Sequence, residues 1–480
     1  MRAIHLVSLA ALVAGCGGKS TVMPDAGPVV DLGPGSTLTD DEAAAARQKC
    51  TFSAGTPPGL SLGKDAPRGP AIPIDTVVIL MMENRSFDHL LGDLPAAGQT
   101  DVEVAPAKVT NPDAKGNPIA RHHLDPFCFD DTAHDWDSVH RQYDGGKLDG
   151  FVVTNEGGLG DPVGARAMGF HTKGDLPFLY GLSTAFAIAD HYHCALLGPT
   201  FPNREYLYAA TSFGYTDNDL FTDARKTIFD ELNAGSISWQ EYYTTLPGSG
   251  VFLDTYTKNI NDHYSRISSF FTDAAAGTLE SVVVLDPNLR DDEGSEHNDD
   301  HPPASAQLGD QFLAQVVKAV TTCPQWPHLA LFITWDEHGG LYDHVVPPAA
   351  CPPDDQTPTR KGDPMIGEQA RVPIAGAFDR YGFRVPLIVV SPYAKPHYVS
   401  HVIYDHTSIT RFVETRFLLP ALTKRDANAA PLLDLFDFSN AAFAKPPSLP
   451  DAPIDPKQQA LCQSMFPFGD GGASPDGGVH

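Results

Sequence analysis

The sequence has few basic residues for its length. Across 480 residues, 33 Lys and Arg stand against 60 Asp and Glu, so the formal net charge is −27. Nucleic-acid binding needs a basic face, and adsorption to anionic lipid needs basic side chains at the membrane. The composition therefore excludes nucleic acid as a partner held by bulk charge. It also disfavours general electrostatic adsorption to a lipid surface.

Cysteine is also scarce, with seven residues and no CxxC pair, which disfavours a zinc ribbon. The first of them, Cys16, follows the small residues Ala14 and Gly15 at the end of a short apolar run over residues 4–13. With Arg2 in front, this pattern resembles a secretion signal that ends in a lipoprotein lipobox, in which Cys16 becomes the acylated N-terminus. An ordinary signal peptide with an incidental cysteine is the alternative.

The other six cysteines would then lie in an exported compartment, where disulfides form. Up to three bridges are expected, in a pairing that the sequence cannot choose. The same reasoning predicts an exported bacterial lipoprotein that a lipid anchor holds to a membrane, in the periplasm or at the cell surface.

Composition divides the chain into a central body with a segment at each end. Residues 1–16 are the predicted lipoprotein signal peptide. Residues 17–70 are rich in Gly, Pro, Asp and Ala and are predicted to form a flexible tether, although the acidic triplet at residues 40–42 can start a short helix. Residues 71–445 are the expected catalytic domain, and residues 446–480 are expected to form a loop-like tail.

Four apolar runs in the body are typical of the buried strands of a parallel sheet. They cover residues 76–81, 281–285, 329–334 and 385–390, and helical patterns such as that of residues 306–320 lie between them. This alternation predicts an α/β fold with a largely parallel sheet. Ligands bind beyond the carboxyl ends of the strands in such sheets, so the residues that follow each run are candidates for a functional site.

Two of these runs are followed at once by oxygen-bearing side chains. Glu83 and Asn84 lie in the segment MENRSFDH that starts at residue 82, and Asp336 and Glu337 lie in the segment WDEHGGLYDH that starts at residue 335. Adjacent carboxylates repel each other in a buried site, and a divalent cation would relieve that repulsion. The alternative is that both segments are solvated loops whose acids cap helices.

A third segment, GPTFPNR at residues 198–204, offers a candidate nucleophile. Its glycine and prolines indicate a rigid loop around Thr200, and a helix is expected to begin near Asn203. A hydroxyl at a helix N-terminus lies in a positive potential that favours an alkoxide and an incoming phosphate. A metal-bound threonine alkoxide is a credible nucleophile. The alternative is that Thr200 only caps the helix.

Histidines stand in several polar segments near these motifs. His301 lies in the segment NDDHPP at residues 298–303, His134 is followed by Asp135 and Trp136, and His406 follows an aspartate. Imidazoles can hold phosphoryl oxygens or transfer protons at neutral pH, whereas any one histidine taken alone is more often structural.

Taken in order, these segments resemble the signatures of the bacterial phosphoesterase family that contains phosphatidylcholine-type phospholipases C and an acid phosphatase. Residues 82–89, 200–204, 298–303 and 335–344 are similar to four of its motifs. Ala210–Ser212 is similar to a stretch of the plant non-specific phospholipases C. Each segment is short, but the ordered set across residues 73–440 is specific.

The resemblance implies an alkaline-phosphatase-like, three-layer α/β/α sandwich with a largely parallel central sheet. It also implies one divalent metal ion, of unspecified identity, bound by Glu83, Asn84, Asp336 and Glu337. Thr200 would complete the metal shell and attack phosphorus.

Other roles are likewise implied by the resemblance. His134 and His301 would bind phosphoryl oxygens or transfer protons, and His344 would be a further catalytic residue. The resemblance also assigns His406 to the site, whereas His338 occupies a variable position. The substrate would be a phospholipid or a related phosphodiester, cleaved through a phospho-enzyme at the threonine.

An acid phosphatase that acts on phosphomonoesters is the alternative, because only 40 residues follow position 440 and many bacterial phospholipases C append further modules there. A non-catalytic metal-binding lipoprotein and a glycosidase with two separated carboxylates are rivals from other classes. The intact set of ligands with a threonine loop argues against both rivals.

Overall fold

An eight-stranded sheet forms the middle layer of the computed structural model, which describes residues 35–289, 297–362 and 370–466. In spatial order its strands are β14 (Val399–Ser400), β6 (Ala187–Ala189), β13 (Leu387–Val390), β10 (Leu329–Trp335), β1 (Thr76–Met82), β9 (Val282–Asp286), β7 (Trp239–Tyr243) and β8 (Tyr264–Arg266). Neighbouring strands of this sheet are parallel except on either side of β13. The prediction of a largely parallel sheet is therefore confirmed.

All four predicted strands are present, with ends shifted by one or two residues. β1 and β10 lie side by side near the middle of the sheet, and every residue of both strands is buried. Continuous apolar runs suit this position because helices cover both faces of the sheet. The last run is shorter than predicted and forms the antiparallel strand β13.

Helices surround the sheet. They are α1 (Asp40–Gln48), α2 (Pro58–Ser61), α3 (Phe87–Leu91), α4 (Leu94–Ala97), α5 (Trp136–Tyr143), α6 (Pro177–Ala185), α7 (Thr200–Ala209), α8 (Ile228–Ala234), α9 (Leu253–His263), α10 (Ile267–Ala276), α11 (Ala306–Thr322), α12 (His406–Phe417), α13 (Lys424–Ala427) and α14 (Pro456–Met465). Short strand pairs lie outside the main sheet: β2 (Thr110–Pro112) with β3 (Pro118–Ala120), β4 (His122–His123) with β5 (Gly169–Phe170), and β11 (Thr359–Lys361) with β12 (Arg371–Pro373).

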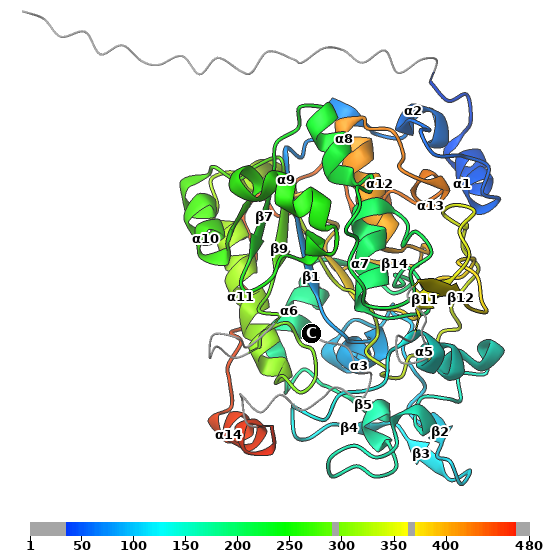
Figure 1. Ribbon diagram of the computed structural model, residues 1–480. Helices are drawn as coiled ribbons and strands as arrows, with labels where there is room; N and C mark the ends of the chain where they lie inside the picture. Colours follow the sequence, from blue (N-terminus) through cyan, green and yellow to red (C-terminus); the bar gives the residue numbers. More distant parts are fainter. Residues whose placement is uncertain (1–34, 290–296, 363–369, 467–480) are drawn as a thin grey trace, which may run out of the picture. The chain divides into compact units, whose positions relative to one another are not determined.

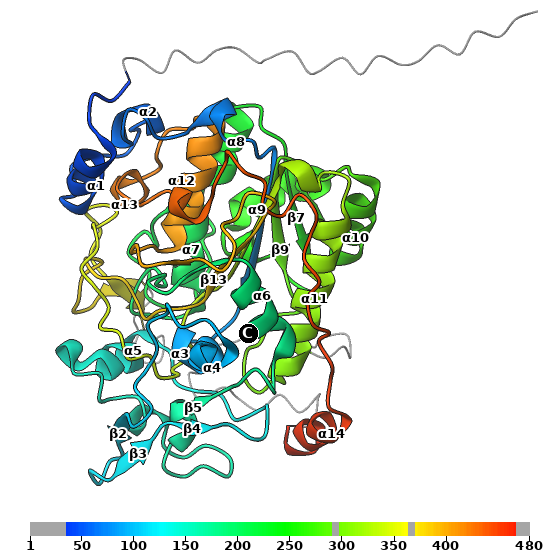
Figure 2. The ribbon, with the colours of Figure 1, turned by 180° about the vertical axis from the view of Figure 1, so that it is seen from behind.

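The helices form two layers with the sheet between them. Ile79, Val282 and Val284 face α7, α8 and α12, and because side chains alternate along a strand, their neighbours face the opposite layer. In both views β7 and β9 lie between α7 and α12 on one side and α10 and α11 on the other (Figures 1 and 2). This is the predicted three-layer α/β/α arrangement.

The predicted flexible tether is wrong for residues 40–61. A capping box between Thr39 and Glu42 starts α1, as the acidic triplet allowed, and α2 follows it. A disulfide joins Cys50 to Cys351 and ties this segment to the catalytic body. The predicted signal peptide, Cys16 and the rest of residues 1–34 lie outside the described residues.

The predicted loop-like tail also needs correction. Residues 456–465 form α14, which begins at the cap residue Asp455, and a disulfide joins Cys462 to Cys128. Two of the three expected bridges therefore exist among the described residues, while Cys194 and Cys323 are buried free thiols. Among the described helices, none has the length and apolar character needed to cross a bilayer.

Candidate active site

The two loops that carry the predicted ligands meet at the carboxyl edge of the sheet. Met82 at the end of β1 pairs with Trp335 at the end of β10 in parallel register. Glu83 and Asp336 therefore leave the sheet side by side. The backbone N–H of Asn84 donates a hydrogen bond to Asp336 Oδ1 over 3.0 Å. The predicted convergence of both loops at one end of the sheet is confirmed.

Left-handed backbone conformations let the two loops approach each other closely. Asn84 has a φ of 60°, a conformation that asparagine adopts more readily than most residues. Gly339 lies opposite with a φ of 64°, and a Cβ there would be 2.1 Å from the carbonyl oxygen of Asn84. Only glycine satisfies both constraints at position 339.

Two oxygens of the predicted ligand set are buried without a hydrogen-bond partner in the described part of the chain. They are Asn84 Oδ1 and Glu337 Oε1, on side chains with no exposed surface. An unpaired buried polar atom costs about 1–3 kcal/mol, and more when it carries charge. Hard divalent cations bind carboxylate and amide oxygens. The chemistry of these donors therefore suits a divalent cation.

The carboxylates of this site perturb one another. Burial raises the pKa of Glu83, with Arg204 opposing the shift, and burial together with the charge of Glu83 raises the pKa of Asp336. For Glu337 burial is outweighed by nearby imidazoles and amides, chiefly His134, so its pKa lies below the ordinary value. A positive charge beside the first two carboxylates would favour their ionised forms.

A buried arginine that the sequence reasoning missed lies at the centre of these carboxylates. Arg204 donates from Nη2 to Glu83 Oε1 over 2.9 Å, from Nε to Asp336 Oδ2 over 3.3 Å and from Nη1 to Asp286 Oδ1 over 3.4 Å. Burial opposes the guanidinium charge, but the carboxylates, chiefly Glu83 and Asp336, outweigh it and raise the pKa of Arg204. Asp286 was also missed, although it ends the apolar run of β9 just as Glu83 follows that of β1.

Thr200 is the first residue of α7, three positions before the expected helix start. The loop before it is held by Asn203, whose amide donates to the carbonyl oxygens of Gly198 and Pro199 over 2.8 and 3.0 Å. Arg204 follows Thr200 by four residues, and side chains at this spacing lie on one face of a helix. The helix face of Thr200 is thus the face that contacts Glu83 and Asp336.

His134 and His301 lie at the same edge of the sheet. His134 Nε2 is 3.2 Å from the side-chain nitrogen of Asn84, and the ring centroids of His134 and His301 are 5.7 Å apart. The Nδ1–H groups of the two rings donate to the carbonyl oxygens of Thr132 and Pro302 over 2.6 and 2.5 Å. Both imidazoles are therefore oriented by the backbone.

Asp131 completes this imidazole cluster and was not predicted. Three ligand atoms, one from each of Asp131, His134 and His301, lie within 4.8 Å of one another. Burial opposes the charged form of His301, but the carboxylates of Asp131 and Glu83 outweigh it and raise the pKa of His301. A protonated imidazole here can hold an anionic oxygen beside the predicted cation site.

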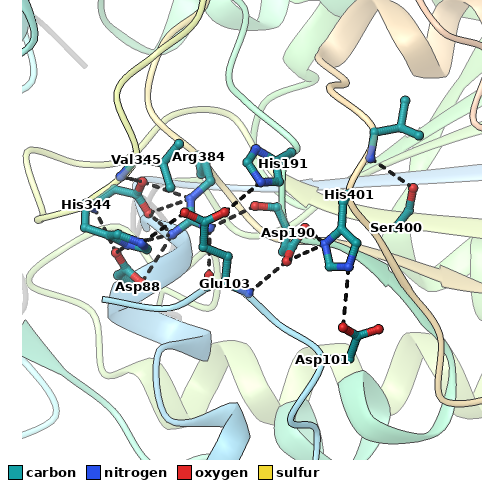
Figure 3. Close-up of polar contacts among 12 residues, drawn as sticks. Asp88, Asp101, Glu103, Asp190, His191, His344, Val345, Arg384, Ser400 and His401 are labelled. Carbon is teal, nitrogen blue, oxygen red and sulfur yellow. Dashed lines mark hydrogen bonds and ion pairs between the residues drawn. The ribbon is translucent and has the colours of Figure 1, made fainter. Parts of the chain in front are cut away.

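The structure does not bring His344 to this site. Its Nδ1 lies 2.6 Å from Asp88 Oδ2 and its Nε2 lies 3.5 Å from Glu103 Oε1 (Figure 3). Arg384 contacts Asp88 over 3.2 Å and Asp343 over 2.9 Å, so a guanidinium already supplies the cation for these acids. Among the described contacts, His344 has none with the predicted metal ligands, and its predicted catalytic role stays a prediction.

His406 and His338 contact the loop that carries Asp336 and Glu337. His406 Nε2 donates to the carbonyl oxygen of Asp336 over 2.6 Å, and burial lowers the pKa of His406 to about 4. His338 Nδ1 lies 3.3 Å from Glu337 Oε2, and its Nε2 lies 2.8 Å from Gln142 Oε1. His338, at the position predicted to be variable, is fully buried and contacts a predicted ligand.

Known proteins resemble this chain over most of its length. The sequence matches the Phosphoesterase family over residues 74–420. It is 32% identical to non-specific phospholipase C1 from Arabidopsis thaliana, covering 74% of this chain and 69% of that protein. It is 29% identical to phospholipase C A from Mycobacterium tuberculosis, covering 78% and 79%. A solved structure from the alkaline phosphatase superfamily, from Vibrio parahaemolyticus, is 10% identical with a TM-score of 0.35, covering 71% of this chain and 76% of that chain.

Proposed function

The chain belongs to the Phosphoesterase family and is a hydrolase of ester bonds, and from this premise we propose that it cleaves phosphodiesters, with phospholipids as the substrate class. The proposed reaction is of the phospholipase C type. Thr200 is the proposed nucleophile, and a phospho-threonine is the proposed intermediate. Two similar proteins are named phospholipases C, which supports a diester rather than a monoester substrate.

The observation that carries the proposal is the convergence of the ligand set beside the helix of Thr200. Glu83 and Asn84 from one loop, and Asp336 and Glu337 from another, meet at one edge of the sheet. Two of their oxygens are buried with no partner among the described residues. The helix that starts at Thr200 contacts the same carboxylates through a residue one turn later.

The chain's own residues provide the rest of the chemistry. Glu83, Asn84, Asp336 and Glu337 would hold a divalent cation, which when bound supplies Lewis-acid stabilisation to oxygens on phosphorus. Thr200 Oγ attacks phosphorus in line and gives up its proton, and the P–O bond to the alcohol breaks as that alcohol takes up a proton.

The phospho-threonine is then hydrolysed. Water attacks the phosphorus, the bond to Thr200 Oγ breaks, and a proton returns to the hydroxyl. His134 and His301, oriented by carbonyl groups, hold the non-bridging oxygens as charge develops on them. For a glycerophospholipid the first product is diacylglycerol and the second is the phosphorylated head group.

A substrate panel tests this proposal. Purified protein would be assayed with p-nitrophenyl phosphate, p-nitrophenyl phosphocholine and a p-nitrophenyl glycoside, each with and without a chelator. The expected result is preferential, chelator-sensitive hydrolysis of the phosphodiester. Faster turnover of the monoester favours the acid-phosphatase alternative. Glycoside hydrolysis, or activity on none of the three, overturns the proposal.

We also propose that the protein is exported and anchored through a lipid on Cys16. The support is the sequence pattern of an apolar run followed by Ala14, Gly15 and Cys16, together with two disulfides, which are typical of an exported protein. Cys16→Ser should move the protein from the membrane fraction to the soluble fraction or block its processing. Unchanged fractionation together with a mature N-terminus elsewhere contradicts the anchor.

A further inference from the structure

The guanidinium of Arg204 joins the ends of three neighbouring strands. Glu83 follows β1, Asp336 follows β10 and Asp286 ends β9, and each contacts a different nitrogen of the guanidinium. Arg204 is 1% exposed, so neither solvent nor a substrate reaches it freely. A lysine offers a single nitrogen and could not make these three contacts in one geometry.

The surroundings of Arg204 are shaped to hold this geometry. Asp286 Oδ2 accepts a hydrogen bond from the backbone N–H of Gly248 over 2.9 Å. A Cβ at position 248 would lie 2.5 Å from Asp286 Oδ1 and 3.0 Å from Arg204 Nη1. The absence of a side chain at Gly248 is therefore what leaves room for the arginine–aspartate pair.

We infer that Arg204 is a positioning residue for the cation site. Its contacts fix the Glu83 and Asp336 carboxylates in the orientation that presents them to the cation, and they lock α7, which carries Thr200, to the same carboxylates. Hydrogen-bonded partners of ligating carboxylates typically contribute 10–100-fold to metal affinity. This inference rests on the proposed metal site.

A positioning role and a purely electrostatic role of Arg204 predict opposite changes in metal affinity when the residue is replaced. If Arg204 only adds positive charge, its removal strengthens cation binding, because a repulsive charge is lost. If it orients the ligands, its removal weakens binding, even when the charge is kept. Arg204→Gln and Arg204→Lys separate these two roles.

The experiment measures metal binding without catalysis. Metal-free full-length protein would be titrated calorimetrically with Mn²⁺, Zn²⁺ and Ca²⁺, each alone, and variants compared with the ion that wild type binds most tightly. We expect Arg204→Lys to weaken binding 10–100-fold and Arg204→Gln to weaken it at least as much. Gly248→Ala changes no charge and should also weaken binding, by displacing the arginine.

Matched controls separate these effects from general damage. Arg411 is as buried as Arg204, and its Nη1 donates a hydrogen bond to Glu414 Oε2 over 2.6 Å. Neither Arg411 nor Glu414 belongs to the ligand loops, so Arg411→Lys should leave metal affinity unchanged. Gly59 lies in α2, and a Cβ at this position would meet nothing within 4 Å. Gly59→Ala should therefore also leave metal affinity unchanged. Thermal unfolding of each metal-free variant reports whether it is folded.

The outcomes distinguish a failure of the metal site from a failure of the role proposed for Arg204. If Asp336→Asn binds the ion as tightly as wild type, or wild type binds none, the metal site itself is refuted. If Asp336→Asn loses binding while Arg204→Lys and Gly248→Ala keep it, only the role of Arg204 is refuted. Tighter binding by Arg204→Gln refutes it as well.

Discussion

Thr200 is the residue on which the proposed chemistry depends most. It is 6% exposed and lies at the N-terminus of α7 behind a loop that Asn203 holds in place. Thr200→Val keeps the shape of the side chain and removes its hydroxyl, so kcat should fall by a factor on the order of 10³ or more. KM should change much less. Steady-state kinetics on the preferred phosphodiester measures both.

Thr200→Ser is the matched control, because it keeps the hydroxyl and loses only a methyl group. It should retain measurable activity, and rapid quenching should trap a phosphorylated protein in both wild type and this variant. Near wild-type hydrolysis by Thr200→Val would show that a water molecule, rather than the threonine, attacks phosphorus.

Asp300 is a buried carboxyl that makes stability depend on pH. Its Oδ2 accepts a hydrogen bond from Trp335 Nε1 over 2.9 Å, while its Oδ1 has no partner among the described residues. Burial raises the pKa of Asp300 to about 7, against the opposing charge of Arg85. Between about pH 4 and pH 7 the native side chain holds a proton that the unfolded chain releases. The free energy of unfolding therefore falls as pH rises through this window.

Asp300→Asn should remove this pH dependence, because the amide does not titrate. Each pH unit inside the window contributes up to about 1.4 kcal/mol. Urea unfolding at pH 5 and pH 7 should show a loss of about 2 kcal/mol for wild type beyond that of the variant. Equal losses in both proteins would mean that Asp300 stays ionised in the native state.

At the scale of elements, the approach of the two ligand loops depends on Gly339. A Cβ at this position meets the carbonyl oxygen of Asn84 at 2.1 Å and forces a left-handed φ on a non-glycine residue. Gly339→Ala should therefore lower the free energy of unfolding by about 2 kcal/mol or more and weaken metal binding at least tenfold. Urea unfolding and calorimetric titration measure the two effects.

Gly116 is the control for the conformational part of that effect. It also has a positive φ, of 81°, but a Cβ there meets nothing within 4 Å. Gly116→Ala should cost only about 1 kcal/mol and leave metal binding unchanged. If the two alanine variants behave alike, backbone strain rather than the contact between loops determines the result.

At the scale of the whole described chain, two disulfides tie terminal segments to the body. Cys50 and Cys351 are separated by 301 residues, and Cys128 and Cys462 by 334. Cys50→Ser with Cys351→Ser should lower the free energy of unfolding by about 2–4 kcal/mol, because the unfolded chain loses a long cross-link. Denaturant unfolding with and without a reducing agent measures this difference.

The free thiol Cys323 provides the comparison. Cys323→Ala removes a buried thiol without removing a bridge, so it should remain sensitive to reducing agent to the same extent as wild type. The double serine variant should instead be less sensitive to reduction than wild type. Equal sensitivity in all three proteins would contradict a stabilising role for this bridge.

The sequence by itself determined the strands of the catalytic body and the residues that follow them. Continuous apolar runs are a local signal, because a strand covered on both faces cannot include polar side chains. The rule that ligands lie beyond the carboxyl ends of parallel strands then led to Glu83, Asn84, Asp336 and Glu337. The two loops that carry these residues meet as predicted, since β1 and β10 are neighbours in the sheet.

Only the tertiary structure decided which charged groups meet. Arg204 contacts Glu83 across 121 residues of sequence and Asp336 across 132, and no local pattern encodes a contact between such distant segments. The same holds for His344, which lies seven residues after Glu337 but pairs with Asp88 instead. The sequence predicts flexible terminal segments because Gly, Pro and Asp are frequent there. Within the described residues, these segments contain α1, α2 and α14, and disulfides join their Cys50 and Cys462 to cysteines hundreds of residues away.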